Sequence, residues 1–195
     1  IPYIAMVFCE TNVYRSYNLL DRKINLQWKD KKYFCCYLSK RSSERKRYVR
    51  EEFWDKICAY AKENNLGECH ALGVCNGIQK LGIDKNESTK LCDAKYESSH
   101  DAVVELYSQY KFVIAFENDN SDCGYITEKI CFPFLANSIP IYWGDKRIKK
   151  IFNSSSFLYV SNIDTFILEQ LKIISEDEHI YNSIINQKII TKENF

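Results

Sequence analysis

The sequence predicts an α/β domain built on a mainly parallel sheet with helices on both faces. Three observations lead to this fold class. Short continuous apolar runs recur along the chain, segments of helical period lie between them, and 195 residues suffice for one domain with its own core. Strands that alternate with helices form βαβ units, whose parallel sheet is buried on both sides.

The beginning of the chain follows a different pattern. Residues 1–30 lack a clear hydrophobic period, and we expect them to form an arm or an interdomain connection. Residues 31–195 form the predicted domain. The chain begins at Ile1 rather than Met, and we expect it to be a piece of a longer protein.

The first half of the predicted domain supplies one clear strand and one clear helix. Tyr33–Leu38 is apolar throughout, as in a buried strand, and Arg47–Asn64 carries apolar side chains along one helical face. The stretch Gly67–Gly82 is expected to be loop that holds one short strand at most. Ser98–Asp101 resembles a capping box for a helix that runs through Tyr107.

The second half continues the alternation of strands and helices. The predicted elements are a strand at Phe112–Phe116, a helix from about Thr127, a strand at Ile139–Trp143, a short helix near Lys146, a strand at Phe157–Val160, and helices at Asp164–Ile174 and Asp177–Ile189. Pro133 falls inside the predicted helix after Thr127, where a proline is expected to kink it. The order of elements indicates a Rossmann-like domain, in which ligands bind beyond the carboxyl ends of the strands.

Composition excludes several classes of protein. The formal net charge is +1, without the basic excess that nucleic-acid or membrane-surface binding usually needs. We therefore expect no nucleic-acid partner. The nine cysteines are odd in number and irregular in spacing, which favours a reducing compartment over a disulfide framework or a zinc site.

The candidate site lies between Glu117 and Lys129, where the predicted strand ends and the next predicted helix begins. A helix start offers unpaired N–H groups and a positive dipole end, both of which favour phosphate, and Lys129 adds a cation. Glu128 suits sugar hydroxyls, whereas Asn118 and Tyr125 suit a nucleoside. The alternative, which spacing alone favours, is that Thr127 caps the helix while Glu128 and Lys129 are solvated.

Arg50 is the second candidate. Its helical phase places it in the middle of the apolar stripe of Arg47–Asn64, where an unpaired charge is costly. We expect its partner to be either a phosphate, which arginine binds through a bidentate fork, or an internal carboxylate.

Three blocks of residues together resemble the α-1,3/α-1,4-fucosyltransferases, glycosyltransferase family 10. They are Tyr110–Asn118, Gly124–Lys129 and Ile139–Gly144, in the order and spacing of that family. The strand and helix around Arg50 are similar to its other donor-site element, and the resemblance covers about Lys32 to Tyr181.

The resemblance implies that this chain is the C-terminal, donor-binding half of a two-domain GT-B fold. It implies GDP-fucose as donor substrate, with Arg50 and Lys129 on the diphosphate, Asn118 and Tyr125 along the nucleotide, and Glu128 against fucose. The reaction would be inverting transfer of fucose to a hydroxyl of a glycan acceptor, with Arg50, Glu128 and Lys129 as the catalytic set. The resemblance requires no metal and no cofactor besides the donor.

The general base is the part of the expected machinery that this sequence lacks. In the family it comes from the N-terminal domain, which we expect to be missing here and which would be a partner of this chain. Glu10 is a remote candidate. Two alternatives stay open at this stage: a non-catalytic module that binds a sugar nucleotide or a glycan, and a GT-B transferase that uses another nucleotide sugar.

Overall fold

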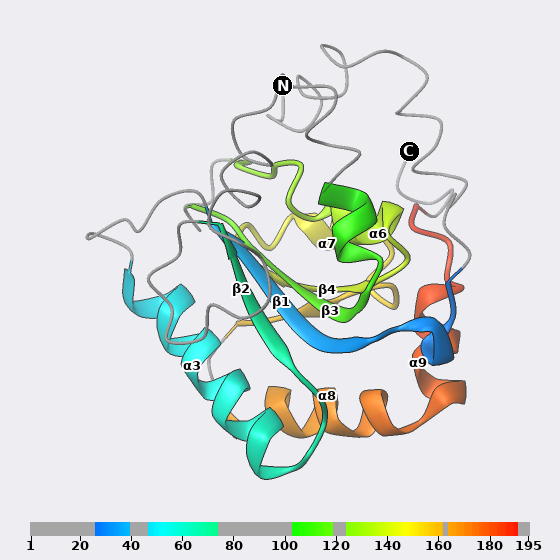
Figure 1. Cartoon of the computed structure of the whole chain (residues 1–195). Helices are drawn as coiled ribbons and strands as arrows, with labels where there is room; N and C mark the ends of the chain where they lie inside the picture. The colour runs from blue at the N-terminus through cyan, green and yellow to red at the C-terminus, as the bar shows by residue number, and fades with distance from the viewer. Residues whose placement is uncertain (1–25, 40–46, 74–102, 119–123, 162–163, 191–195) are drawn as a thin grey trace.

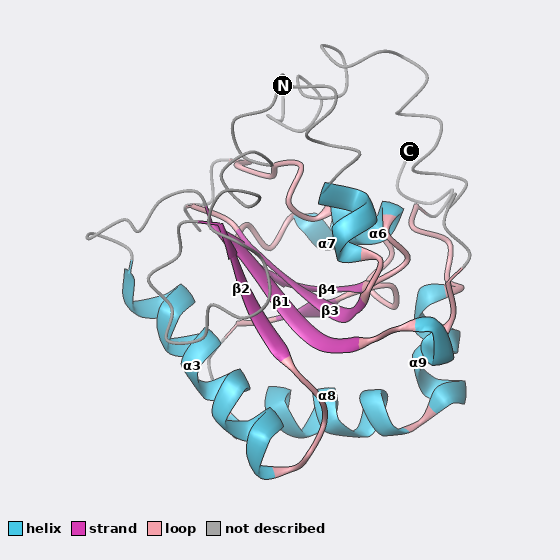
Figure 2. Cartoon of the chain, viewed as in Figure 1, coloured by secondary structure: helices cyan, strands magenta, loops and turns pink. Residues whose placement is uncertain are grey.

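The computed structural model describes residues 26–39, 47–73, 103–118, 124–161 and 164–190. Within these ranges the chain forms a five-stranded sheet of order β2-β1-β3-β4-β5, in which every neighbouring pair is parallel (Figures 1 and 2). The strands are β1 (Tyr33–Ser39), β2 (Cys69–Gly73), β3 (Tyr110–Phe116), β4 (Ile139–Trp143) and β5 (Leu158–Tyr159). The predicted α/β class with a parallel sheet is confirmed.

Helices cover both faces of the sheet. The helical elements are η1 (Trp28–Asp30), α3 (Arg47–Glu63), α6 (Cys131–Leu135), α7 (Ile148–Ile151), α8 (Thr165–Glu176) and α9 (Glu178–Ile185), with a further helical turn over residues 103–107. Figure 1 shows α3 and α8 along one side of the sheet and α6 and α7 along the other.

The alternation of side chains along β3 explains why two layers of helices are needed. Phe112, Ile114 and Phe116 face the core layer that includes α3, α8 and α9. Val113 and Ala115 point the opposite way, toward the 103–107 turn and toward α6 and α7. Because both faces of the strand are apolar, both must be covered, as in parallel sheets generally.

The strand order reverses between β1 and β3. The chain goes from β1 outward to β2 through α3, then returns across β1 to form β3, β4 and β5 on the other side. At such a reversal the loops after the two central strands diverge, which opens the usual binding crevice of this fold. The start of α3 and the end of β3 therefore meet at one place.

The helix predicted from Thr127 begins four residues later than expected. Thr127 bonds to the carboxylate of Glu117, which follows β3, instead of capping a helix; residues 128–130 form a turn, and α6 starts at Cys131. Pro133 is then the third residue of α6, where no intrahelical acceptor precedes it. The reason to expect a kink, a proline in a helix interior, therefore does not apply, because Pro133 lies in the first turn of α6.

The other predicted elements are found with shifted ends. The strands β3, β4 and β5 and the helices α3 and α8 lie where predicted, α9 ends at Ile185 rather than at Ile189, and the expected short strand after Gly67 is β2. The capping box at Ser98–Asp101 and most of the predicted arm, residues 1–25, lie outside the described residues. None of the described helices is both long and apolar enough to cross a bilayer.

Candidate functional site

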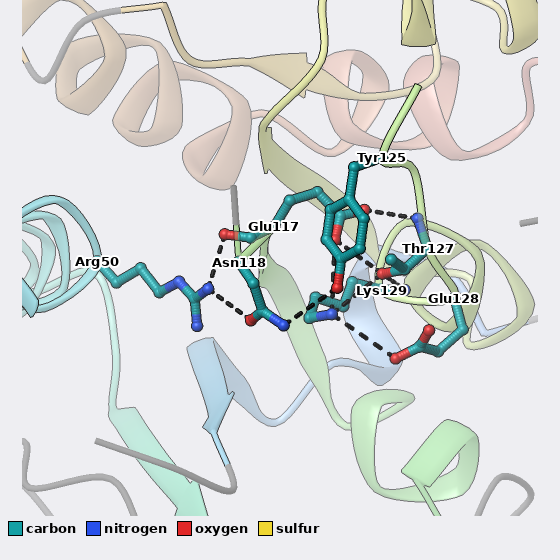
Figure 3. Close-up of polar contacts among 7 residues, drawn as sticks. All are labelled: Arg50, Glu117, Asn118, Tyr125, Thr127, Glu128 and Lys129. Atoms are coloured by element: carbon teal, nitrogen blue, oxygen red, sulfur yellow. Dashed lines mark hydrogen bonds and ion pairs between the residues drawn. The ribbon is translucent and has the colours of Figure 1, made fainter. Parts of the chain in front are cut away.

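The carboxylate of Glu117 is the centre of the candidate site. Glu117 directly follows β3 and is 0% exposed, and its N–H continues the ladder by donating to the carbonyl of Trp143 (2.9 Å). One carboxylate oxygen accepts the N–H of Thr127 at 2.7 Å, and the other accepts the Thr127 hydroxyl at 2.8 Å. This double contact fixes the segment that follows Gly124 against the end of the sheet (Figure 3).

Lys129 lies on the same cluster. Its ammonium donates to the Thr127 hydroxyl oxygen (3.0 Å) and lies 3.5 Å from a Glu117 oxygen and 3.7 Å from a Glu128 oxygen. The side chains of Lys129 and Glu128 are 28% and 27% exposed, so both still reach solvent. The turn at residues 128–130 thus presents an acid and a base side by side at the end of β3.

Arg50 reaches the same strand end from α3. One terminal nitrogen, Nη2, donates to the backbone carbonyl of Glu117 (2.8 Å) and to the side-chain oxygen of Asn118 (2.6 Å). The Nε atom is buried and has no hydrogen-bond partner among the described residues. Of the two partners expected for Arg50, a phosphate or an internal carboxylate, no carboxylate contacts it within the described residues, and two neutral oxygens hold the guanidinium.

Asn118 connects Arg50 to Tyr125. Its amide nitrogen donates to the Tyr125 hydroxyl at 3.2 Å, while its oxygen accepts from Arg50. Figure 3 shows Arg50, Asn118 and Tyr125 joined in a row by these hydrogen bonds. The structure thus brings together all five residues predicted for the site, with Arg50 at one end and Lys129 and Glu128 at the other.

A second buried carboxylate, Asp145, fixes Gly124, at the start of the segment that leads to Thr127. Asp145 follows β4, is 0% exposed, and accepts the N–H of Gly124 at 2.7 Å. The Arg147 side chain forms a forked ion pair with Asp145, with Nη2 at 2.6 Å and Nε at 2.9 and 3.0 Å from its oxygens. Hydrogen bonds from Arg147 lower the pKa of Asp145 to about 2, although burial acts in the opposite direction.

Gly144 lets the end of β4 approach Glu117 closely. A Cβ atom at this position would lie 2.6 Å from the Tyr142 hydroxyl and 2.8 Å from Cγ of Glu117. The Tyr142 hydroxyl is itself buried and unpaired among the described residues. No side chain larger than hydrogen fits at position 144 without displacing a buried neighbour.

Burial dominates the electrostatics of Glu117. Loss of hydration raises the pKa of its carboxyl, while the positive charge of Lys129 and the two hydrogen bonds from Thr127 lower it and the nearby Glu128 raises it. The same carboxylate raises the pKa of Tyr142, for which burial is again the largest cause. Glu117 is therefore costly to keep ionised, and Lys129 is the cation that compensates it.

The arrangement of donors and acceptors would suit an anion joined to a polyol chemically. Two cations from separate elements flank one strand end, and a partly exposed carboxylate lies next to one of them. The family model described as "Glycosyltransferase family 10 (fucosyltransferase) C-term" matches residues 28–188. The chain belongs to glycosyltransferase family 10.

Relatives of this family 10 chain occur in a virus, a bacterium and a mammal. A predicted fucosyltransferase of Acanthamoeba polyphaga mimivirus is 36% identical over 170 residues, which cover 86% of this chain and 26% of that protein. The α-(1,3)-fucosyltransferase FucT of Helicobacter pylori is 38% identical over 79 residues, 40% of this chain and 16% of that protein. GDP-fucose protein O-fucosyltransferase 3 of Homo sapiens is 29% identical, with 75% and 27% covered.

Solved structures of fucosyltransferases share the fold. An α1,3-fucosyltransferase with GDP-fucose superposes with a TM-score of 0.61 at 22% identity, covering 92% of this chain and 43% of that chain. The same enzyme type with GDP gives 0.59 at 24% identity, with 83% and 40% covered. These likenesses confirm a Rossmann-like domain equivalent to the C-terminal half of a GT-B fold. The family 10 chain spans about a quarter or less of its curated relatives.

Sequence reasoning did not single out Glu117, Asp145 or Gly144. The sequence marks Glu117 as the residue after the predicted strand, and an acid that directly follows the apolar run Phe112–Phe116 is a signal of a buried, paired carboxylate. Asp145 carries no such signal, because its partner Gly124 is 21 residues away. Among the described residues, no group of three metal-ligating side chains gathers, and the described cysteines are free.

Proposed function

We propose that this chain is the donor-binding domain of a fucosyltransferase and binds GDP-fucose at the end of β3. The single observation that carries the proposal is the convergence of Arg50 from α3 and Lys129 from the turn before α6 on Glu117, Asn118 and Thr127. This place lies at the strand-order reversal, where the fold binds nucleotides. Family membership and fucosyltransferase relatives of known donor support the choice of GDP-fucose.

Each predicted residue then has a role that its surroundings allow. Arg50 and Lys129 bind the diphosphate. The buried Nε–H of Arg50, which has no acceptor among the described residues, is available to donate to it. Tyr125 lies along the nucleotide, and the partly exposed Glu128 accepts hydrogen bonds from fucose hydroxyls. Asn118 lies between the two groups, next to the nucleotide.

The reaction we propose is inverting transfer. The oxygen of an acceptor hydroxyl attacks the anomeric carbon of fucose, the bond from that carbon to the β-phosphate oxygen breaks, and its electron pair leaves with GDP. The hydroxyl proton passes to a general base outside the described residues, which we expect in the N-terminal part of a longer protein. Arg50 and Lys129 stabilise the negative charge that develops on the leaving diphosphate.

Calorimetric titration of the folded chain with GDP tests the donor site. Arg50→Ala should weaken binding by about 1.5–3 kcal/mol, the range for a charge-assisted hydrogen bond, which is roughly 10- to 150-fold. Lys129→Ala should weaken it at least as much, because it also leaves the carboxylates of Glu117 and Glu128 beside the diphosphate. Lys56→Ala is the matched control, since Lys56 is exposed on α3 and pairs only with Glu52 in the described structure.

The outcomes of the titration are distinct. Absence of GDP binding by the wild-type chain at millimolar concentration would refute the donor site, and equal affinity in Arg50→Ala and Lys56→Ala would refute the assignment of Arg50. Competition by GDP-fucose against GDP-mannose and UDP-galactose then separates a fucosyl donor site from the site of another GT-B transferase.

A further inference from the structure

We infer that Asn118 is a positioning residue that orients Arg50 through a neutral acceptor and so keeps the charge of the guanidinium available to an anion. This inference rests on the proposed function, but it assigns Asn118 a role different from contact with the nucleotide. It follows from how the three described cations around the strand end are held.

Two of these cations are already compensated by acids. Arg147 forms a forked ion pair with the buried Asp145, and Lys129 lies within 4 Å of Glu117 and Glu128. An ion pair of this kind lowers the attraction of the cation for a second anion, because the partner carboxylate repels that anion. These two side chains therefore present a reduced net charge to a ligand.

Arg50 is held differently. Its Nη2 donates to the backbone carbonyl of Glu117 and to the amide oxygen of Asn118, and no described carboxylate forms an ion pair with it. Both acceptors orient the guanidinium without cancelling its charge. Both contacts are short, 2.8 Å to Glu117 and 2.6 Å to Asn118, as expected for hydrogen bonds from a charged donor.

The amide orientation of Asn118 is fixed by its two neighbours. The side facing Arg50 must be the oxygen, because a guanidinium only donates, and the nitrogen then faces the Tyr125 hydroxyl at 3.2 Å. Both ends of the amide are thus occupied inside the protein. An asparagine bound at both ends is suited to holding its neighbours in place rather than to reading a ribose, the role that the sequence suggested.

Aspartate would fail at this position although it has the same shape. Its oxygen could still accept from Arg50, but the negative charge would neutralise the guanidinium and lie beside the diphosphate. An aspartate also has no N–H to donate to Tyr125. The neutrality of Asn118 is therefore a testable requirement, distinct from its size.

A double-mutant cycle on GDP binding tests the positioning role. The proteins are wild type, Arg50→Ala, Asn118→Ala, the double variant and Asn118→Asp, each checked for folding by thermal unfolding; Asn118 is exposed, so these changes should leave the fold intact. We expect Asn118→Ala to weaken GDP about tenfold, and the double variant to match Arg50→Ala within about twofold, since Asn118 acts through Arg50. Asn118→Asp should bind more weakly than Asn118→Ala.

Two results would overturn the inference. If the double variant binds about tenfold more weakly than Arg50→Ala, the effects are additive and Asn118 contacts the ligand directly. If Asn118→Asp binds as tightly as wild type, a neutral acceptor is not needed.

A measurement without ligand separates this inference from the proposed function. In the nitrogen-15 NMR spectrum of the free chain, the Nε–H signal of Arg50 should be sharp and displaced from those of solvated arginines in wild type, and should join them in Asn118→Ala. An unchanged signal in Asn118→Ala refutes the positioning role even if wild type binds no GDP, whereas failure of wild type to bind GDP refutes only the donor site.

Discussion

Replacing Gly144 by alanine tests whether the end of β4 and Glu117 are packed as tightly as the structure indicates. The new Cβ would lie 2.6 Å from the Tyr142 hydroxyl and 2.8 Å from Cγ of Glu117, closer than any ordinary carbon contact. Both neighbours are buried, so neither can move into solvent. Overpacking of a core costs about 1–3 kcal/mol, and the φ of 158° adds backbone strain of about 1 kcal/mol.

We therefore expect Gly144→Ala to lower the free energy of unfolding by about 3 kcal/mol. For a domain of this size the melting temperature should fall by roughly 6–12 °C. Urea denaturation followed by circular dichroism measures the change. Gly124→Ala is the matched control: its φ is 77°, but its Cβ would meet its nearest atom, Nη2 of Arg147, at an ordinary 3.7 Å. This control carries the cost of the backbone conformation without the overlap.

A second variant identifies the cause of the loss. Tyr142→Phe removes the hydroxyl that would collide first, so Gly144→Ala should cost about 1 kcal/mol less in the Tyr142→Phe background. Tyr142→Phe alone should be neutral or slightly stabilising, because the buried hydroxyl has no hydrogen-bond partner among the described residues. If Gly144→Ala destabilises no more than Gly124→Ala, the close approach of β4 to Glu117 is wrong.

Two further predictions concern the buried carboxylates. Burial raises the pKa of Glu117 in the folded state, so the contribution of this residue to stability is full below its unfolded pKa of about 4.3 and is lost as pH rises through its folded pKa. The stability of Glu117→Gln relative to wild type should therefore rise between pH 4 and 8. A constant difference between the two proteins would contradict this. The pKa of Asp145 is about 2, below its unfolded value, so it stabilises the fold above about pH 4 and this is lost as pH falls toward 2. Asp145→Asn should cost about 1–2 kcal/mol at pH 7, discounted because Arg147 is 44% exposed, and much less at pH 2, where the folded carboxyl is already largely protonated; equal costs at both would refute it.

The strands of this domain could be predicted because each is encoded locally. Ile139–Trp143 is a continuous apolar run with clear ends, and the structure forms β4 over the same residues. The long helix α3 was predicted for a similar reason, since its buried face repeats at helical spacing in Phe53, Trp54 and Ile57. In these segments the local pattern and the tertiary environment agree.

The start of α6 could not be predicted, because a residue ten positions away determines it. Thr127 has the side chain of a helix cap, and local reasoning assigns it that role. The carboxylate of Glu117 takes both its N–H and its hydroxyl instead, so the helix begins only at Cys131. Pairing between Glu117 and Thr127 depends on the fold, and no local pattern reveals it.

The sheet topology explains why the candidate site contains residues so far apart in sequence. Arg50 belongs to the connection after β1 and Asn118 lies two residues beyond the end of β3, 68 positions later, yet β1 and β3 are neighbours in the sheet. The reversal of strand order at this pair sends the two connections to opposite sides of the strand end, so each can supply one cation to a ligand between them. The spacing of Arg50 and Lys129 is then set by the pairing of β1 with β3 and by the clamp of Glu117 on Thr127, which are buried features. A change in either should therefore disturb the proposed donor site more than most substitutions on its exposed rim.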